Sequence, residues 1–293
     1  ALGSAGLVAA WLPGPVWATA SPAALALTAL TGLLMLLPAS EAVVALVNRL
    51  ISESVPPVHL PRLLLAKGIP PEAQVMVVIP ALLGHRAGID ALVRRLQLHH
   101  LANPEAHAQF ALLSDWTDAD TEHHPDDDAL LAHAADALRT LNRQHPVAAD
   151  APARFLLLHR ARTFSATQAQ WLGWERKRGK LAELNRLLRG ATDTSFVADT
   201  AAIRQDIRYV ITLDADTRLL RDTVRRMVGK MAHPLNRAQF DVARQRVIKG
   251  YGILQPRVTP ALPVANEGSV FQQIHASNGG IDTYAAAISD VYQ

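Results

Sequence analysis

Two carboxylates, Asp214 and Asp216, follow directly on an apolar run that extends from Tyr209 to Leu213. On a β-strand, a spacing of two residues turns both side chains to the same side. Paired carboxylates suit a hard divalent cation, and Mg²⁺ in nucleotide-using enzymes keeps some waters and takes further oxygen ligands from phosphates. The pair is therefore a candidate Mg²⁺ or Mn²⁺ site, although the same tripeptide is also common in surface loops without a function.

A cluster of cations precedes this run, with the sequence RKRGK at residues 176–180. The pattern indicates a loop that leads into a helix. Backbone amides at a helix start, together with Lys180, can hold a diphosphate, and Gly179 would allow the backbone to approach it closely. The alternative is a basic helix face that contacts only solvent.

The elements that would position these groups are short apolar segments that alternate with helical patterns. We predict strands at 75–79, 110–113, 155–158 and 209–213, and helices at 86–102, 128–143 and 168–189. This alternation predicts an α/β fold, Rossmann-like, in which helices cover both faces of a mostly parallel sheet. We assign this domain to residues 59–293.

Polar side chains fall where several of the predicted strands end. They are Asp115, His159, Arg160, Asp214 and Asp216. In open α/β sheets, ligands bind outside the carboxyl ends of the strands. The sequence therefore predicts one site there, with acidic groups for a metal and a ribose beside basic groups for phosphate.

A second group of possible metal ligands, His123 and His124 with the aspartates at 126–128, has a simpler interpretation. Contiguous residues cannot all point inward at one ion. We therefore interpret this stretch as a solvated loop in which Asp126 or Asp127 caps the next helix.

Composition and missing motifs argue against several functional classes. The formal net charge is +3, from 29 Lys and Arg against 26 Asp and Glu spread along the chain, and this does not suggest nucleic-acid binding. The lack of cysteine removes disulfides, cysteine zinc sites and thiol nucleophiles. No dinucleotide-binding glycine motif, Walker loop or Gly-x-Ser-x-Gly elbow is present, which argues against oxidoreductases, P-loop NTPases and serine hydrolases.

Residues 1 to about 51 differ from the rest in being rich in Ala, Leu and Val, and we assign residues 1–58 to a membrane-spanning and interfacial segment. The uncharged run at 23–40 is long enough to cross a bilayer, and no basic region precedes it as in a cleavable signal peptide. Beyond it, residues 40–51 have the pattern of an amphipathic helix at the membrane surface, with Ser40 as its N-cap. The alternative is a core helix of a soluble protein.

Basic residues follow this membrane segment, at Arg49, Arg62 and Lys67. By the positive-inside tendency they place the rest of the chain in the cytoplasm. The chain begins without Met and ends at Gln293 without a helix stop or turn signal, so we expect it to be part of a longer protein.

Two enzyme classes have Asp-x-Asp after a strand. In haloacid-dehalogenase-like phosphatases a hydroxyl residue stands two beyond the second Asp, whereas here Thr217 follows at once and Arg218 takes the expected place. That motif also belongs to the first strand of its sheet, and here the strand is about the fourth. In nucleotide-sugar glycosyltransferases of the GT-A type, the motif follows several βα units, and this order matches.

Several longer motifs resemble the glycosyltransferase domain of the cyclic β-1,2-glucan synthases. They are KRGKLAELN at 177–185, YVITLDADT at 209–217, MAHPLN at 231–236, GYGILQPRV at 250–258, GIDTY at 280–284 and SDVYQ at 289–293, with LPR at 60–62 and KGIP at 67–70. The resemblance covers most of the chain. It implies a large bacterial inner-membrane protein that polymerises glucose from UDP-glucose, with a distal phosphorylase-like domain that lies outside this sequence.

The resemblance also implies roles for individual residues. Asp115 would contact the uridine, Lys180 the uridine and diphosphate, Asp214 the ribose or the sugar, and Asp216 the metal. Neighbours in the same signature are assigned to nucleotide-sugar binding as well: Lys177, Arg178 and Asn185. A predicted strand at 251–254 leads to Gln255 and Arg257, which would line the sugar or acceptor side or form a structural turn.

The general base has no match, since Glu267 and Asp282 fit its expected place poorly, and we expect it beyond Gln293. The resemblance thus implies an inverting, metal-dependent glucosyltransferase whose partners are UDP-glucose, a growing glucan, the lipid bilayer and the remaining domains. An alternative from another class is a membrane-anchored module that binds a nucleotide sugar without turnover.

Overall fold

The computed structural model describes residues 21–54, 60–197 and 200–256. The chain divides into two compact units, and the unit at 61–252 contains the central sheet. The other unit combines residues 1–60 with residues 253–293, and its described part is mainly one long helix.

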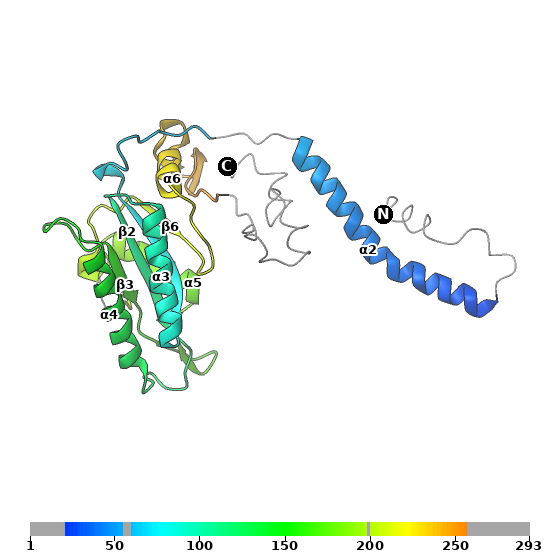
Figure 1. Ribbon diagram of the computed structural model, residues 1–293, viewed down its shortest axis with the longest axis horizontal. Helices are drawn as coiled ribbons and strands as arrows, with labels where there is room; N and C mark the ends of the chain where they lie inside the picture. Colours follow the sequence, from blue (N-terminus) through cyan, green and yellow to red (C-terminus); the bar gives the residue numbers. More distant parts are fainter. Residues whose placement is uncertain (1–20, 55–59, 198–199, 257–293) are drawn as a thin grey trace. The chain divides into compact units, whose positions relative to one another are not determined.

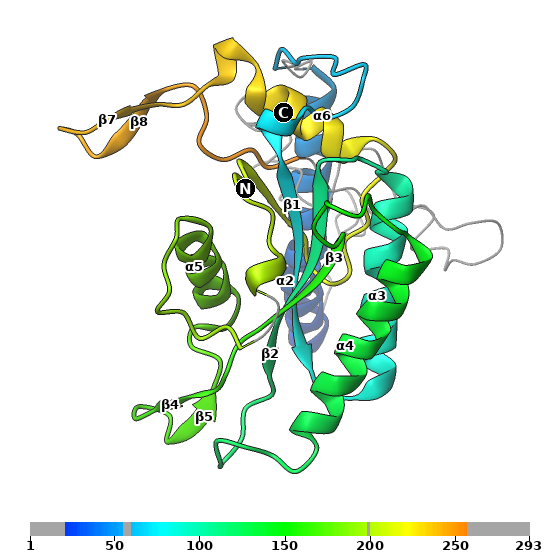
Figure 2. The same ribbon diagram turned by 90° about the vertical axis from the view of Figure 1, so that its left-hand side faces the viewer.

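Four parallel strands form the sheet (Figures 1 and 2). They are β1 (Val75–Leu83), β2 (Ala108–Trp116), β3 (Phe155–His159) and β6 (Tyr209–Thr212), in the spatial order β3-β2-β1-β6. The chain steps outward from β1 to β3 and then returns to add β6 on the other side of β1. The predicted α/β, Rossmann-like fold is confirmed, and the order of its strands reverses between β1 and β6, where sheets of this kind bind ligands.

Helices cover both faces of the sheet, as Figure 2 shows. The helices α3 (Arg86–Ala102), α4 (Asp127–Gln144) and α6 (Thr223–Ala232) bury their apolar residues in one core cluster with the sheet. The helix α5 (Arg176–Leu188) contributes Leu184 to a second cluster on the other face. Because successive strand residues point to opposite faces, strands covered on both sides are mostly apolar, and this explains the apolar runs in the sequence.

The strand β1 is longer than predicted, because it continues through Pro80 to Leu83. The β6 side of β1 is paired only from Val75 to Val78. The Leu213 amide donates to the Val78 carbonyl, so the Pro80 nitrogen, two residues later, faces the same side beyond the paired stretch. A proline is tolerated there because no ladder hydrogen bond is lost.

The predicted helix at 168–189 is wrong in its first part. That segment forms a hairpin of β4 (Thr163–Ser165) and β5 (Gln170–Leu172), and α5 begins only at Arg176. The rings of Phe164 and Trp171 lie opposite each other across the hairpin, with centroids 5.6 Å apart. This aromatic pair is a contact that stabilises antiparallel strands rather than a helix.

A second hairpin lies near the end of the described residues, β7 (Gln239–Asp241) with β8 (Arg246–Lys249). The predicted strand at 251–254 is wrong: Tyr251 makes one isolated bridge, to Arg237, and the next three residues join no strand. Three short 3-10 helices complete this inventory: η1 (Pro71–Ala73), η2 (Thr200–Ala202) and η3 (Pro234–Asn236).

The other unit contains α2 (Pro22–Ser54), one uninterrupted helix with Pro38 inside it. The prediction that a separate helix starts at Ser40 is wrong, because the Ser40 hydroxyl donates to the Leu37 carbonyl of the preceding turn instead of capping a new one. Residues Ala26–Val47 have a mean hydropathy of 2.0 and are long enough to cross a bilayer. Signal sequences and buried core helices meet the same criteria of length and hydropathy.

Candidate functional site

The carboxyl end of β6 leads directly into Asp214 and Asp216. The strand ends at Thr212, and the Thr217 amide donates to the Asp214 carbonyl at 3.0 Å, so the pair lies in a turn just past the strand. The argument that a strand directs both carboxylates to one side is therefore wrong, because the strand has already ended. Both residues are exposed beside the carboxyl end of β1, at the point where the strand order reverses.

The first turn of α5 reaches the same place. Lys177 forms an ion pair with Asp214, and about half of each side chain remains in solvent (51% and 62% exposed). Its neighbours Arg176 and Arg178 pair with Asp118 and Glu175 at the same end of the helix. The structure thus brings the basic stretch and the acidic pair together, although they are far apart in the sequence.

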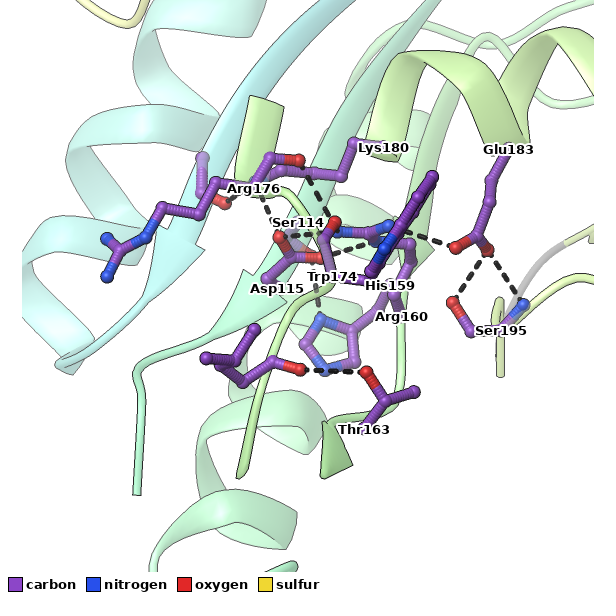
Figure 3. Close-up of polar contacts among 12 residues, drawn as sticks. Ser114, Asp115, His159, Arg160, Thr163, Trp174, Arg176, Lys180, Glu183 and Ser195 are labelled. Carbon is purple, nitrogen blue, oxygen red and sulfur yellow. Dashed lines mark hydrogen bonds and ion pairs between the residues drawn. The ribbon is translucent and has the colours of Figure 1, made fainter. Parts of the chain in front are cut away.

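A second set of charges at the strand ends is buried, and Figure 3 shows it. Asp115, at the end of β2, has a side chain that is only 1% exposed. Arg160, just past β3, donates to both of its carboxylate oxygens, from Nε at 2.7 Å and from Nη2 at 3.0 Å. Lys180 of α5 adds a third contact, with its Nζ 3.1 Å from Asp115 Oδ2. Three contacts from two cations of the protein therefore hold this carboxylate.

The same network extends into α5. Arg160 Nη1 donates to Glu183 Oε1 at 3.0 Å, and the other oxygen of Glu183 accepts from the amide and hydroxyl of Ser195. The Lys180 ammonium also donates to the Ala81 carbonyl in β1, at 2.7 Å. The network therefore fastens α5 to the carboxyl ends of three neighbouring strands (Figure 3).

The two lysines of α5 differ in burial: Lys180 is buried, whereas Lys177 is half exposed. Removal from water lowers the pKa of Lys180, and the adjacent Asp115 carboxylate offsets part of this effect. In the described state, Asp115 and Lys180 bind each other and other protein groups, and neither reaches solvent. Their predicted contacts with uridine and diphosphate remain predictions, whereas Lys177 already lies in the open part of the site.

Gly179 lies inside α5 rather than in an open loop. A Cβ at this position would lie 2.0 Å from the Trp174 carbonyl oxygen. A glycine is thus required here because α5 packs closely against Trp174. The sequence had suggested a different reason, namely close approach of the backbone to a diphosphate.

Beneath the network, His159 is fully buried and its Nδ1 lies 2.8 Å from the hydroxyl of Ser114. Burial lowers the pKa of His159 to about 4, since desolvation outweighs the opposing charges of Asp115 and Asp127. The imidazole is therefore neutral at physiological pH. The sequence pattern predicts His159 near phosphate, but the ring is buried below the charged network and contacts Ser114 instead.

The acidic loop before α4 is mostly solvated, as predicted: the side chains of His123 and His124 are 85% and 56% exposed. Asp127 is the exception, because its carboxylate accepts from the His124 amide and pairs with buried Arg162. Asp126 occupies the N-cap position of α4 without a capping hydrogen bond from its side chain. Within the described residues, no cluster of three or more His, Asp or Glu side chains could hold a metal by itself.

The remaining predicted residues lie elsewhere. Asn185 is exposed on α5. Gln255 is exposed and belongs to the other unit. Arg257, Glu267, Asp282 and Gln293 lie outside the described residues. Arg160 was predicted at the strand ends, from its position directly after a strand, but was given no individual role. It contacts more groups of the site than any residue that was given one.

Comparison with known proteins gives one clear relationship. No family model matches the chain. The chain is 46% identical over 261 residues to "Cyclic beta-(1,2)-glucan synthase NdvB" of Rhizobium meliloti (strain 1021), a match that covers 89% of this chain. The chain spans only 9% of the length of that protein. The recognition made from the motifs is thereby confirmed, and this chain is homologous to one segment of a cyclic β-(1,2)-glucan synthase.

Proposed function

We propose that this chain is the donor-binding part of a glucosyltransferase that uses UDP-glucose to extend a β-1,2-glucan with inversion at the anomeric carbon. The observation that carries the proposal is the 46% identity to a segment of a glucan synthase. The location of Asp214 and Lys177 at the reversal of strand order is consistent with it, because parallel sheets bind nucleotides there.

The proposed metal is Mg²⁺ or Mn²⁺, held by Asp216 with Asp214 beside it. Both residues are exposed and carry hard oxygen ligands. Two carboxylates are too few for an all-protein cage, but Mg²⁺ is commonly held by one or two carboxylates together with substrate phosphates. The donor set therefore fits an ion that arrives with the nucleotide sugar, and such an ion would neutralise charge on the departing UDP.

The roles of the protein groups follow from their exposure. Lys177, whose side chain is half in solvent, would exchange Asp214 for the diphosphate, as a flexible point charge can. Asp214, once released, would accept hydrogen bonds from the ribose or sugar hydroxyls. Arg160 and Lys180 would hold Asp115 in one orientation beneath the nucleotide. The acceptor hydroxyl would lose its proton to a carboxylate that we do not assign.

The proposed setting is the cytoplasmic side of a bacterial inner membrane. The helix α2 would cross or anchor at the bilayer through Ala26–Val47, and the basic residues that follow it favour a cytoplasmic location for the sheet. The partners in this proposal are the nucleotide sugar, the growing glucan, the bilayer and further domains of a longer protein.

The test is the binding of UDP to the full 293-residue chain in detergent, measured by calorimetry with and without Mn²⁺. We expect Mn²⁺ to strengthen binding at least tenfold, and Asp216→Asn to remove this gain. The matched control is Asp136→Asn, which changes an exposed aspartate on α4 and should leave the gain intact. Binding that ignores Mn²⁺ and survives Asp216→Asn would remove Asp216 from the site, and the absence of any UDP binding would reject the donor.

A further inference from the structure

A cavity lined in part by charged side chains lies away from the site just described, between α3 and the loop that follows Asp216. Its volume is about 350 Å³, within the usual size range of small-ligand pockets. Its polar lining consists of Arg94, Arg95 and His99 from α3 and Arg218 from the loop, with Leu98 and Leu219 beside them. We call it the arginine cavity.

All charged side chains that line the arginine cavity are positive. Three guanidinium groups line it, and its lining includes no carboxylate. Within the described residues, no acidic side chain forms an ion pair with Arg94, Arg95 or Arg218, whereas several other arginines of the sheet unit have such partners. Like charges gathered without a counter-charge repel one another, so an anion would be stabilised among them.

His99 adds a buried donor to this lining. Its side chain is 2% exposed, and its Nδ1 accepts from the Leu219 amide at 3.4 Å. Burial lowers the pKa of His99 to about 4, helped by the nearby charge of Arg95, so the ring is neutral and its hydrogen lies on Nε2. That Nε2 is buried and has no hydrogen-bond partner among the described residues. Every polar group that the cavity side chains can offer is therefore a donor, and a donor-only site suits an oxyanion.

The loop from 214 to 222 connects the arginine cavity to the acidic pair. Besides the His99 contact, the Leu220 carbonyl accepts from the side chain of Asn103, just past α3, at 3.3 Å. The Asp222 amide donates to the Ala102 carbonyl at 3.1 Å. An anion that joins Arg218 to Arg94 would add a further link between this loop and α3.

We propose that the arginine cavity binds a phosphate-type oxyanion, either free or in a lipid headgroup, and that its occupancy holds the loop that carries Asp214 and Asp216 against α3. Arginine is well suited to this role, because its planar guanidinium donates two parallel hydrogen bonds to a phosphate. The site is separate from the proposed donor site and does not depend on the identity of the donor.

Calorimetry on the full chain in an uncharged detergent tests the site with two probes, inorganic phosphate and monomeric short-chain phosphatidylglycerol. We expect saturable binding of at least one probe, and a stronger response to one of them identifies its source. The double variant Arg94→Gln, Arg218→Gln should weaken that binding at least tenfold. The control variant Arg139→Gln, Arg143→Gln removes the same charge from the exposed surface of α4 and should bind as the wild type does.

Three results would overturn the proposal. The first is that neither probe binds saturably. The second is that the cavity variant and the control variant bind the probe with equal affinity. The third is that Lys177→Gln abolishes binding while the double variant Arg94→Gln, Arg218→Gln retains it, which would place the anion at the donor site. The effect on the loop is read separately, by hydrogen exchange of residues 214–222. Exchange should slow when the probe is bound, and unchanged exchange in the bound protein would overturn the coupling.

Discussion

Two contacts between α5 and the strand ends use the same residue types in opposite surroundings. Lys180 and Arg160 meet Asp115 where no side chain is more than 4% exposed. Lys177, less than one helical turn away, meets Asp214 with half of both side chains in solvent. Paired charges in low dielectric cannot be separated without leaving an uncompensated charge, whereas exposed pairs exchange easily with water and ions.

The difference divides the site into a fixed part and an exchangeable part. The buried network fastens α5 to the sheet and fixes where its first turn lies. The exposed pair is held only weakly, so a ligand that carries its own charge can replace either partner at low cost. A donor site needs both properties, because a rigid scaffold orients groups that must themselves remain available.

The largest effect is expected from Arg160→Met. This change leaves the Glu183 carboxylate without its cation and leaves Asp115 with Lys180 alone, and loss of one partner of a buried pair typically costs about 3–5 kcal/mol. Urea unfolding in detergent, followed by tryptophan fluorescence, measures the free energy of unfolding. The control Arg139→Met breaks an exposed pair with Asp136 and should cost less than about 1 kcal/mol. Similar losses in both variants would show that the network is not the fixed part.

A pH effect of similar size should come from His159. Its pKa is lowered from 6.5 to about 4 by burial, so above pH 6.5 the ring is neutral in both the folded and unfolded chains. Between pH 6.5 and 4 only the unfolded chain takes up the proton, and stability falls by about 3 kcal/mol in total. His159→Asn should remove this part of the acid dependence of unfolding. The exposed His123→Asn should leave it unchanged, and a wild-type slope in His159→Asn would contradict the assignment.

A smaller loss is expected from Gly179→Ala, which tests the rigid placement of α5. The new Cβ would meet the Trp174 carbonyl oxygen at 2.0 Å, and overpacking of this kind costs about 1–3 kcal/mol. Gly252→Ala is the matched control, since its Cβ would approach only Val247, at an ordinary 3.7 Å. Thermal unfolding of both variants measures the difference. Equal midpoints would mean that α5 can move away from Trp174 freely.

The sheet could be predicted from the sequence because its strands are buried on both faces. Runs such as those at 75–83 and 155–158 are then apolar, and the polar residues at or just after the strand ends mark the carboxyl ends. The location of Asp115 and Arg160 at one edge of the sheet followed from this rule alone.

The surroundings of single side chains could not be predicted in the same way. Lys180 belongs to a run of cations, a pattern typical of a solvated helix face. It is buried because it contacts Asp115 and Ala81, which are distant in sequence. The hairpin at 163–172 has strands too short to show a period of two. The turn at Asp214 begins where the pairing of β6 with β1 ends, and no pattern in the sequence predicts the residue at which that pairing ends.

The smallest stability effect is expected from the exposed pair. A double-mutant cycle with Lys177→Gln and Asp214→Asn should give a coupling free energy below about 1 kcal/mol, because exposed ion pairs gain little over water. The unfolding free energies of the wild type, both single variants and the double variant supply the cycle. UDP binding should nevertheless weaken in Lys177→Gln, since the diphosphate would lose its cation. A coupling above about 2 kcal/mol would mean that Lys177 and Asp214 belong to the scaffold, and the division of the site into fixed and exchangeable parts would fail.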